Sequence, residues 1–203
     1  MYHLGTIKIS TERLVLRQFN NNDAIGIFNS YINDEKFLYY ANKEKVSLEQ
    51  IKQWLSSIDK KYENKEYYNW VITLKDNEVI GAINLRVDNE NDLVWLNYAI
   101  GKRHNNRGYM TEALNAVKDF ALNNLKVRKI IGGCELNNIA SQRVMEKCGF
   151  KFEEVRKNEL LLKDGLHDLK IFSVFIAVGE HGKAVNTSGC EPDTGRCDSC
   201  YSS

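Results

Sequence analysis

The sequence predicts a mixed α+β fold, in which helices pack on one sheet and residues 1–178 form a single domain. Two kinds of segment support this prediction. Some alternate apolar and polar residues as strands do, and others repeat apolar residues at helical spacing. Turn-forming sequences separate them, in the order β-α-α-β-β-β-α-β-α-β-β. Apolar residues make up 43% of the chain, which is enough for a substantial core.

The N-terminal part is predicted as one strand and two helices. Residues 7–16 alternate as a strand does, and the polar cluster at 20–23 is typical of a turn that caps a helix. Ser47 to Gln50 fits a capping box that begins the second helix. The residues expected to face the core are Ile25, Phe28 and Ile32 on the first helix, and Ile51, Leu55, Ile58 and Tyr62 on the second.

The middle of the chain is predicted as three strands and a helix. Residues 70–74 and 79–87 form a predicted hairpin around the turn at 75–78, and a third strand covers residues 93–100. An amphipathic helix over residues 108–124 follows. Its inner face consists of Met110, Ala113, Leu114, Val117, Phe120 and Ala121.

The C-terminal part is predicted as a strand at 127–134, a helix at 138–148 and two further strands at 150–162 and 166–178. The helix is expected to bury Ala140, Val144 and Cys148 and to end at Gly149 in the left-handed conformation. The last two strands flank Lys163-Asp164-Gly165, which is typical of a hairpin turn.

Residues 179–203 are predicted to be a disordered tail. Apolar residues nearly vanish there, so burial cannot offset the entropy lost on ordering. The tail holds Cys190, Cys197 and Cys200, with His181 before them. Their spacings fit no zinc pattern, so no metal site is predicted.

Composition excludes several classes of partner. The net charge is +1, from 28 basic and 27 acidic residues, which gives no electrostatic reason to expect nucleic acid or an anionic membrane. No long uncharged apolar stretch predicts a transmembrane helix, and the N-terminus lacks the pattern of a secretory signal. We therefore expect a cytoplasmic protein.

The turn at residues 103–108 is the strongest functional signal. It lies between a predicted strand and the start of the helix at 108–124, where backbone N–H groups have no partner within the helix. Those donors and the positive end of the helix dipole favour an anion such as a pyrophosphate. The side chains of Arg103 and Arg107 would help, although Arg107 is equally well explained as a solvated loop residue.

Four segments resemble the GNAT N-acetyltransferases, and within them the RimJ/RimL-like enzymes that acetylate ribosomal-protein N-termini. Residues 11–17, Thr-Glu-Arg-Leu-Val-Leu-Arg, match the opening strand of that subgroup. Val79-Ile80-Gly81 matches a hairpin strand, and residues 103–113 match the acetyl-CoA pyrophosphate motif. Residues 138–150 match the second cofactor motif. All four occur in the family's order, on the expected elements.

The resemblance implies a twisted, mostly antiparallel sheet of about seven strands with helices on both faces. It also implies acetyl-CoA as cosubstrate and direct transfer to a primary amine in a ternary complex. Homodimers are frequent in the family. The implied cofactor-binding residues are Tyr98, Ala99, Ile100, Arg103, Asn106, Arg107, Gly108, Tyr109, Met110, Thr111, Asn138 and Arg143. The first three would contribute backbone groups, where one N–H also meets the developing oxyanion.

Asn106 departs from the family's motif, which has glycine there. Glycine allows a positive φ and a close approach of the backbone to phosphate. Asparagine is the next most tolerant residue in that conformation, so phosphate binding is expected to survive.

The candidate catalytic residues are Asp92, Glu135 and Ser141. Asp92 and Glu135 lie at strand ends, where a carboxylate serves as a base or is simply solvated. A tyrosine of the second motif is replaced by Met145, so Ser141 is the expected proton donor to the leaving thiolate. A serine in the first helical turn equally often bonds only its own backbone. Asn138 is explained as a helix cap alone, although the resemblance adds contact with cofactor or substrate.

Two functions remain open from the sequence. The first is an acetyltransferase that acts on a protein or peptide α-amine, or on a small amine such as a polyamine or aminoglycoside. Tyr39 and Tyr40 lie in the region that caps the acceptor pocket in the family. The second is a non-catalytic sensor or scaffold that binds acyl-CoA, because the tyrosine is missing and the base is uncertain.

Overall fold

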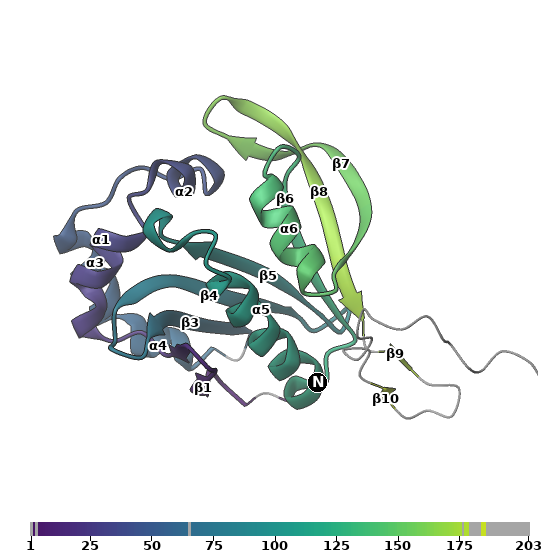
Figure 1. Ribbon diagram of the computed structural model, residues 1–203, viewed down its shortest axis with the longest axis horizontal. Helices are drawn as coiled ribbons and strands as arrows, with labels where there is room; N and C mark the ends of the chain where they lie inside the picture. The colour runs from purple at the N-terminus through teal and green to yellow at the C-terminus, as the bar shows by residue number, and fades with distance from the viewer. Residues whose placement is uncertain (1, 3, 65, 176, 179–183, 186–203) are drawn as a thin grey trace, which may run out of the picture.

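A computed structural model describes residues 2, 4–64, 66–175, 177–178 and 184–185. Eight strands form a sheet in the order β1-β2-β3-β4-β5-β6-β8-β7, and the pair β5–β6 is parallel while the other pairs are antiparallel (Figure 1). The strands are β1 Ile9–Ser10, β2 Leu14–Arg17, β3 Tyr67–Leu74, β4 Val79–Asp88, β5 Leu93–Ile100, β6 Lys129–Glu135, β7 Lys151–Leu162 and β8 Gly165–Phe175.

Helices cover both faces of this sheet. They are α1 Ala24–Ser30, α2 Glu35–Tyr40, α3 Leu48–Ser56, α4 Ile58–Tyr62, α5 Tyr109–Asp119 and α6 Ile139–Lys147, with the short 3-10 turns η1 Asn21–Asp23 and η2 Lys102–His104. One buried cluster joins the sheet to α5 and α6, and a second joins its other face to α1, α3 and α4. The predicted fold class is therefore confirmed.

The first predicted strand is in fact two strands. Thr11 makes a turn between β1 and β2, because its hydroxyl accepts from the Leu14 N–H and its own N–H donates to the Leu14 carbonyl. The sheet consequently has eight strands rather than about seven.

Helix bounds also differ from the predictions. The second predicted helix is split into α3 and α4 at Ser57, and residues 35–40 form α2. The helix expected over 108–124 is α5 followed by a π-helical turn, η3, at Phe120–Leu125.

One predicted helix face is wrong, and another is wrong at one residue. On α1 the core side holds Ala24 and Ile27, with Tyr31 just after the helix, while Ile25 is 63% exposed. Phe28 is also exposed, so the predicted stripe faces outward. On α6, Cys148 is buried and Val144 packs against the core as predicted, while Ala140 is exposed and Gln142 and Met145 are buried as well. The error on α1 arises because a short helix offers two apolar stripes with similar spacing.

Several local predictions are confirmed. Ser47 and Gln50 form the capping box that begins α3. Gly149, after α6, has φ +82°, the left-handed conformation that ends a helix. Residues 163 and 164 turn the hairpin between β7 and β8, in which Leu162 pairs with Gly165. These contacts depend on residues close in sequence, which is why patterns find them.

The tail lies mostly outside the described residues. Within it the structure describes Ala184–Val185, β10, which pairs with β9 at Ala177–Val178. Cys190, Cys197, Cys200 and His181 lie outside the described residues. Among the helices that are described, none combines the length and the apolar character that a membrane span requires.

Asp23→Ala is expected to lower the free energy of unfolding by about 2 kcal/mol, because it leaves a partly buried guanidinium unpaired. The Asp23 carboxylate, 4% exposed, binds Arg17 through two contacts of 2.7 and 2.8 Å and accepts from the Asn20 N–H. Urea denaturation measures the change. Glu49→Ala, which breaks an exposed ion pair with Lys52, is the control and should change stability by less than about 0.5 kcal/mol. Equal losses in both variants would contradict the prediction.

Candidate active site

The two parallel strands at the centre of the sheet open into a wedge. Pairing of β5 with β6 runs from Leu93 opposite Lys129 to Leu96 opposite Gly132, and ends there. Beyond that point each strand remains paired on its outer side, β5 to β4 and β6 to β8. The inner backbone groups of residues 97–100 therefore face the wedge rather than a neighbouring strand. The predicted positions Tyr98, Ala99 and Ile100 lie here.

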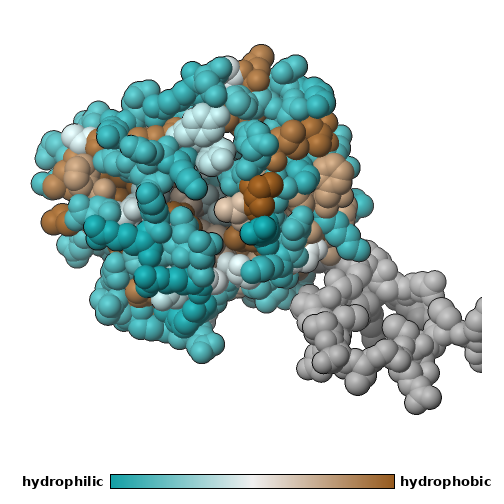
Figure 2. All heavy atoms as spheres, turned by 45° about the horizontal axis from the view of Figure 1, so that its top comes forward, coloured by the Kyte–Doolittle hydropathy of each residue, from teal (hydrophilic) through white to brown (hydrophobic). Residues whose placement is uncertain are grey.

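The face of the molecule that bears the wedge is hollowed. Figure 2 shows a depression near the centre of this face, with paler and apolar side chains around it and hydrophilic ones over most of the remaining surface. In the ribbon view, the wedge lies between the part of the molecule that carries α1 and α3 and the part that carries α6 (Figure 1).

The polar loop between β5 and α5 has the conformation of an anion site. Asn106 has φ +60° and Gly108 has φ +79°, so the positive φ that the sequence requires of Asn106 is confirmed. Gly108 caps α5 and supplies no side chain to its first turn, so the N–H groups of that turn have no capping side chain. The loop therefore presents backbone donors and the positive end of the helix dipole together.

The Arg13 side chain supports this loop through hydrogen bonds. Its Nη1 donates to the Arg107 carbonyl at 3.0 Å, and its Nε donates to Glu112 at 2.7 Å. Glu112 also accepts from the Arg13 N–H and the Thr11 hydroxyl, and the Arg13 guanidinium lies 4.6 Å from the centre of the Tyr109 ring. Hydrogen bonds to Glu112 raise the pKa of Arg13, and hydrogen bonds from Thr11 and Arg13 lower that of Glu112 despite its burial.

The side chains of the predicted cofactor residues lie in different environments. Those of Arg103, Asn106, Arg107 and Arg143 are exposed, and those of Tyr109 and Thr111 are half-buried. Met110 is 5% exposed within the core, so only its backbone faces the loop. Arg103 lines a cleft of about 630 Å³ on the α1 side, with Arg17 and His104. Asn138 caps α6 by accepting from the Ser141 N–H.

Tyr98 and Ser141 form a pair of hydroxyl groups beside the wedge. The Tyr98 Oη and Ser141 Oγ are 2.7 Å apart, and Tyr98 also donates to the Ser141 carbonyl at 3.1 Å. Burial raises the pKa of Tyr98, so its hydroxyl is protonated at neutral pH. Ser141 thus has a side-chain partner besides its role in the helix.

The internal cysteines are buried thiols. Burial raises the pKa of Cys134 and of Cys148 to about 11, so neither is a thiolate at neutral pH. Met145, where the family has a tyrosine, is 1% exposed within the core. Its sulfur would lie 2.7 Å from a Cβ at Gly132, so α6 packs directly on β6 at this position.

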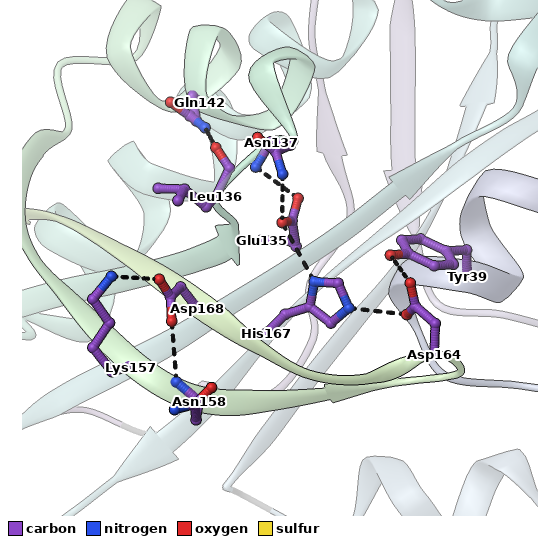
Figure 3. Close-up of polar contacts among 10 residues, drawn as sticks. All are labelled: Tyr39, Glu135, Leu136, Asn137, Gln142, Lys157, Asn158, Asp164, His167 and Asp168. Carbon is purple, nitrogen blue, oxygen red and sulfur yellow. Dashed lines mark hydrogen bonds and ion pairs between the residues drawn. The ribbon is translucent and has the colours of Figure 1, made fainter.

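Glu135 lies at the open end of β6 and is 4% exposed. Its carboxylate accepts from the Asn137 N–H at 2.6 Å and from the Asn137 amide at 3.1 Å (Figure 3). His167 of β8 is next to it, with Nδ1 3.6 Å from Glu135 Oε1. Burial raises the pKa of Tyr40, and the negative charge of Glu135 raises it further. Helix α2 therefore also borders this carboxylate.

A bridge of side chains joins α2 to the β7–β8 turn. The Tyr39 hydroxyl donates to Asp164 at 3.1 Å, and Lys163 pairs with Glu44 at 2.9 Å. A cleft of about 400 Å³ lies there, lined in part by Leu38 and Lys45. Tyr39 and Tyr40 therefore border the region next to Glu135.

Asp92 does not share this site. It lies just before β5, at the end where β5 and β6 are paired, and Glu135 is at the open end. About seven residues of strand separate the two ends, which is roughly 23 Å at 3.3 Å per residue. Instead, the Asp92 carbonyl accepts from the Arg128 N–H and Asp92 has φ +52°, as in a turn.

Sequence reasoning missed two side chains of the site, the Tyr98 hydroxyl and His167. Tyr98 was assigned a backbone role, although strand alternation places it on the same face as Leu96 and Ile100, toward the core under α5 and α6. His167 follows a hairpin turn by two residues, and its partner Glu135 is 32 positions earlier. The register between β6 and β8, which pairs Glu135 with Leu169, brings them together.

Asn106→Val is expected to weaken acetyl-CoA binding by about tenfold, because a β-branched residue at φ +60° costs about 1–3 kcal/mol. Asn106→Gly removes the same side chain but allows this φ and should bind within about threefold of the original protein. Calorimetry with acetyl-CoA measures both. Equal affinities for the two variants would show that the loop conformation does not govern binding.

Comparisons with known proteins agree on one family. The model of the acetyltransferase (GNAT) domain matches residues 13–151. The uncharacterized N-acetyltransferase YoaA of Bacillus subtilis is 27% identical over 168 residues, covering 82% of this chain and 95% of YoaA.

Solved structures share the fold. A ribosomal-protein-S5-alanine acetyltransferase from Vibrio fischeri has a TM-score of 0.72 at 19% identity, covering 83% of this chain and 96% of that one. The microcin C7 self-immunity acetyltransferase MccE, in complex with acetyl-CoA and AMP, has a TM-score of 0.72 at 17% identity, covering 82% and 94%.

Proposed function

The chain belongs to the GNAT acetyltransferase family and is an acyltransferase, and from the site described above we propose that it transfers the acetyl group of acetyl-CoA to a primary amine by direct attack. The observation that carries this proposal is the pairing of a wedge between β5 and β6 with a loop of backbone donors at the start of α5. The two features lie on consecutive segments of the chain, joined by η2.

Acetyl-CoA fits this arrangement in two parts. Its diphosphate is an anion and suits the N–H groups of residues 108–111, which no capping side chain engages. Its pantetheine arm has amide groups that can pair with the inner backbone of residues 97–100, as a further strand would. A solved protein of this fold, MccE, contains acetyl-CoA. The side chains of Arg107, Thr111 and Arg143 are secondary contacts in this proposal.

The Tyr98–Ser141 pair is placed to serve the leaving group. A thiolate leaves when the acetyl group is transferred, and it needs a proton or a hydrogen bond. The Ser141 hydroxyl donates its proton to the sulfur, and the Tyr98 hydroxyl, 2.7 Å away, donates a hydrogen bond to the Ser141 oxygen as it does so. Backbone N–H groups in the wedge stabilise the negative charge that develops on the carbonyl oxygen.

The acceptor amine approaches from the other face of the sheet. Cys134 faces the core under α5 and α6, so the next residue on β6, Glu135, points to the opposite face. Glu135 therefore meets the amine as a carboxylate, next to Tyr39 and Tyr40 of α2. We propose a peptide α-amine as the first acceptor class, because its ammonium ion, with a pKa of about 8, gives up a proton more readily at pH 7 than that of a lysine, at about 10. Small amines are the second class.

An acetyl-CoA turnover assay tests the function. The protein is mixed with acetyl-CoA and a panel of N-terminal peptides, polyamines and aminoglycosides, and thiol release is followed. Turnover with at least one amine is expected. Failure to bind acetyl-CoA at millimolar concentration would overturn the proposal, and binding without turnover on any amine would favour a non-catalytic acyl-CoA-binding domain.

A further inference from the structure

His167 lies between two carboxylates from separate elements. Its Nε2 is 2.9 Å from Asp164 Oδ1 in the β7–β8 turn, and its Nδ1 is 3.6 Å from Glu135 Oε1 at the end of β6 (Figure 3). The His167 side chain is 25% exposed and that of Glu135 5% exposed, so most of the ring is covered. No cofactor contact proposed above uses this ring.

Asp164 fixes the tautomer of the neutral imidazole. An ionised carboxylate only accepts hydrogen bonds, so Nε2 at 2.9 Å carries the proton and Nδ1 keeps its lone pair. Asp164 is itself held by the Tyr39 hydroxyl at 3.1 Å. Although burial raises it, the pKa of Asp164 is lowered by its own backbone, His167 and Tyr39, so it is ionised at neutral pH.

The neutral ring leaves a gap that a cationic donor fits. The Nδ1 lone pair and Glu135 Oε1 are both acceptors, and 3.6 Å between them is too long for a hydrogen bond. An ammonium nitrogen can lie about 2.8 Å from both atoms when they are 3.6 Å apart, and it can then donate a hydrogen bond to each of them. Asn137, the other partner of Glu135, supplies neutral donors and leaves the charge of the carboxylate to be met by a cation.

We propose that His167 is the general base of the acetyl transfer, oriented by Asp164, and that His167 and Glu135 together bind the acceptor as its ammonium ion. This inference rests on the proposed function. Asp164 is a positioning residue, because it acts through the imidazole, and Glu135 binds the charge of the amine. The arrangement follows the logic of an acid–histidine pair, in which the carboxylate selects the tautomer and stabilises the imidazolium that forms.

The proton balance is as follows. The acceptor binds as R–NH3+, and Nδ1 takes one proton, which His167 later releases to solvent. The amine lone pair forms a bond to the thioester carbon, and the carbon–sulfur bond breaks. The sulfur takes a proton from the Ser141–Tyr98 pair, which regains one from solvent, and the second proton lost by the nitrogen goes to solvent. One amide, one thiol and one free proton result.

The two proton-transfer groups lie on opposite faces of the sheet. Tyr98 packs with the core under α5 and α6, and so does Cys134, beside Ser141. Glu135 and His167 project from the other face, toward α2. The amine and the leaving sulfur therefore meet different side chains, so each proton transfer has its own group.

The charged and titratable groups around His167 come from four places. Glu135 faces it from β6, Asp164 from the turn and Tyr39 from α2, where Tyr40 lies near Glu135. Asp168, next along β8, is paired with Lys157 at 2.6 Å. Both carboxylates next to the ring stabilise the imidazolium once it has formed.

The test is the pH dependence of kcat/KM between pH 5.5 and 9.5, with acetyl-CoA and the best amine of the panel. The original protein should give a bell, because His167 must be neutral and the amine protonated. The basic limb is expected near the ordinary value of the amine, about 8. His167→Gln should lose roughly 100-fold in kcat/KM near pH 7 and rise with pH through the amine's own pKa.

Matched variants separate the roles. Asp164→Asn should lose about tenfold and keep the bell, because the tautomer is weakened and the base remains. Glu44→Gln breaks the nearby Lys163 pair without touching His167 and should leave the profile unchanged. Calorimetry should give the same acetyl-CoA affinity for all three, which shows that each is folded.

The failures are distinguishable. If the original protein acetylates no amine, the proposed function fails, and the inference fails with it. If it is active and His167→Gln keeps both its kcat/KM and the bell, the proposed function stands and His167 is not the base. Restoration of His167→Ala activity by added imidazole would support the inference further.

Discussion

Arg13→Met is expected to lower the affinity for acetyl-CoA by about 10- to 100-fold. The variant removes a charge-assisted hydrogen bond worth about 1.5–3 kcal/mol, and each 1.4 kcal/mol is a factor of ten. The methionine keeps the apolar stem over the Tyr109 ring, which the guanidinium approaches to 4.6 Å. Calorimetry with acetyl-CoA and the KM for acetyl-CoA measure the loss.

The reason lies in the geometry of one peptide bond. In a trans peptide, the Arg107 carbonyl and the Gly108 N–H point in opposite directions. Arg13 holds the carbonyl at 3.0 Å, so it directs the Gly108 N–H to the other side of the loop. The same guanidinium neutralises Glu112, whose negative charge in the first turn of α5 would otherwise repel an anion. Arg13 is thus a positioning residue for the anion site.

Acetyl-pantetheine separates this role from a general loss of structure. It carries the same thioester and pantetheine arm but lacks the diphosphate. Arg13→Met should therefore leave kcat/KM for acetyl-pantetheine within about threefold while lowering that for acetyl-CoA. Arg86→Met, which changes an exposed arginine on β4, is the control for charge alone. Equal losses for both thioesters would show that Arg13 only supports the fold.

Sequence reasoning located the features that depend on neighbouring residues. The left-handed Asn106, the caps at Ser47 and Asn138, and the turn before Gly165 each follow from a few consecutive residues. Such contacts depend on local backbone geometry and on the residue types in the turn, so a single sequence is enough to predict them.

The features that it missed depend on contacts between distant segments. Arg13 meets Glu112 across 99 positions, and Tyr39 meets Asp164 across 125. Asp92 and Glu135 look alike as strand-end carboxylates, and only the point at which β5 and β6 separate distinguishes them. Likewise, the buried side of α1 depends on what packs against it, and its exposed Ile25 has the same hydrophobicity as its buried Ile27.

Ser141→Ala is expected to lower kcat by about 10- to 100-fold and to change acetyl-CoA affinity by less than about threefold. The serine hydroxyl serves the sulfur only as the carbon–sulfur bond breaks, so its loss is felt in the transition state. Steady-state kinetics and calorimetry give the two quantities. Ser56→Ala, an exposed serine in α3, is the matched control and should leave both unchanged. An unchanged kcat would remove Ser141 from the mechanism.

Tyr98→Phe extends the same prediction to the pair. If the two hydroxyls act as one unit, the double variant Ser141→Ala/Tyr98→Phe should be no slower than the slower single variant. The 2.7 Å contact between the oxygens supports that expectation, because either one loses its partner when the other is removed. Independent roles would instead multiply the two losses. Because the half-buried Tyr98 ring packs against the core, its phenylalanine variant keeps that packing, and the comparison isolates the hydroxyl.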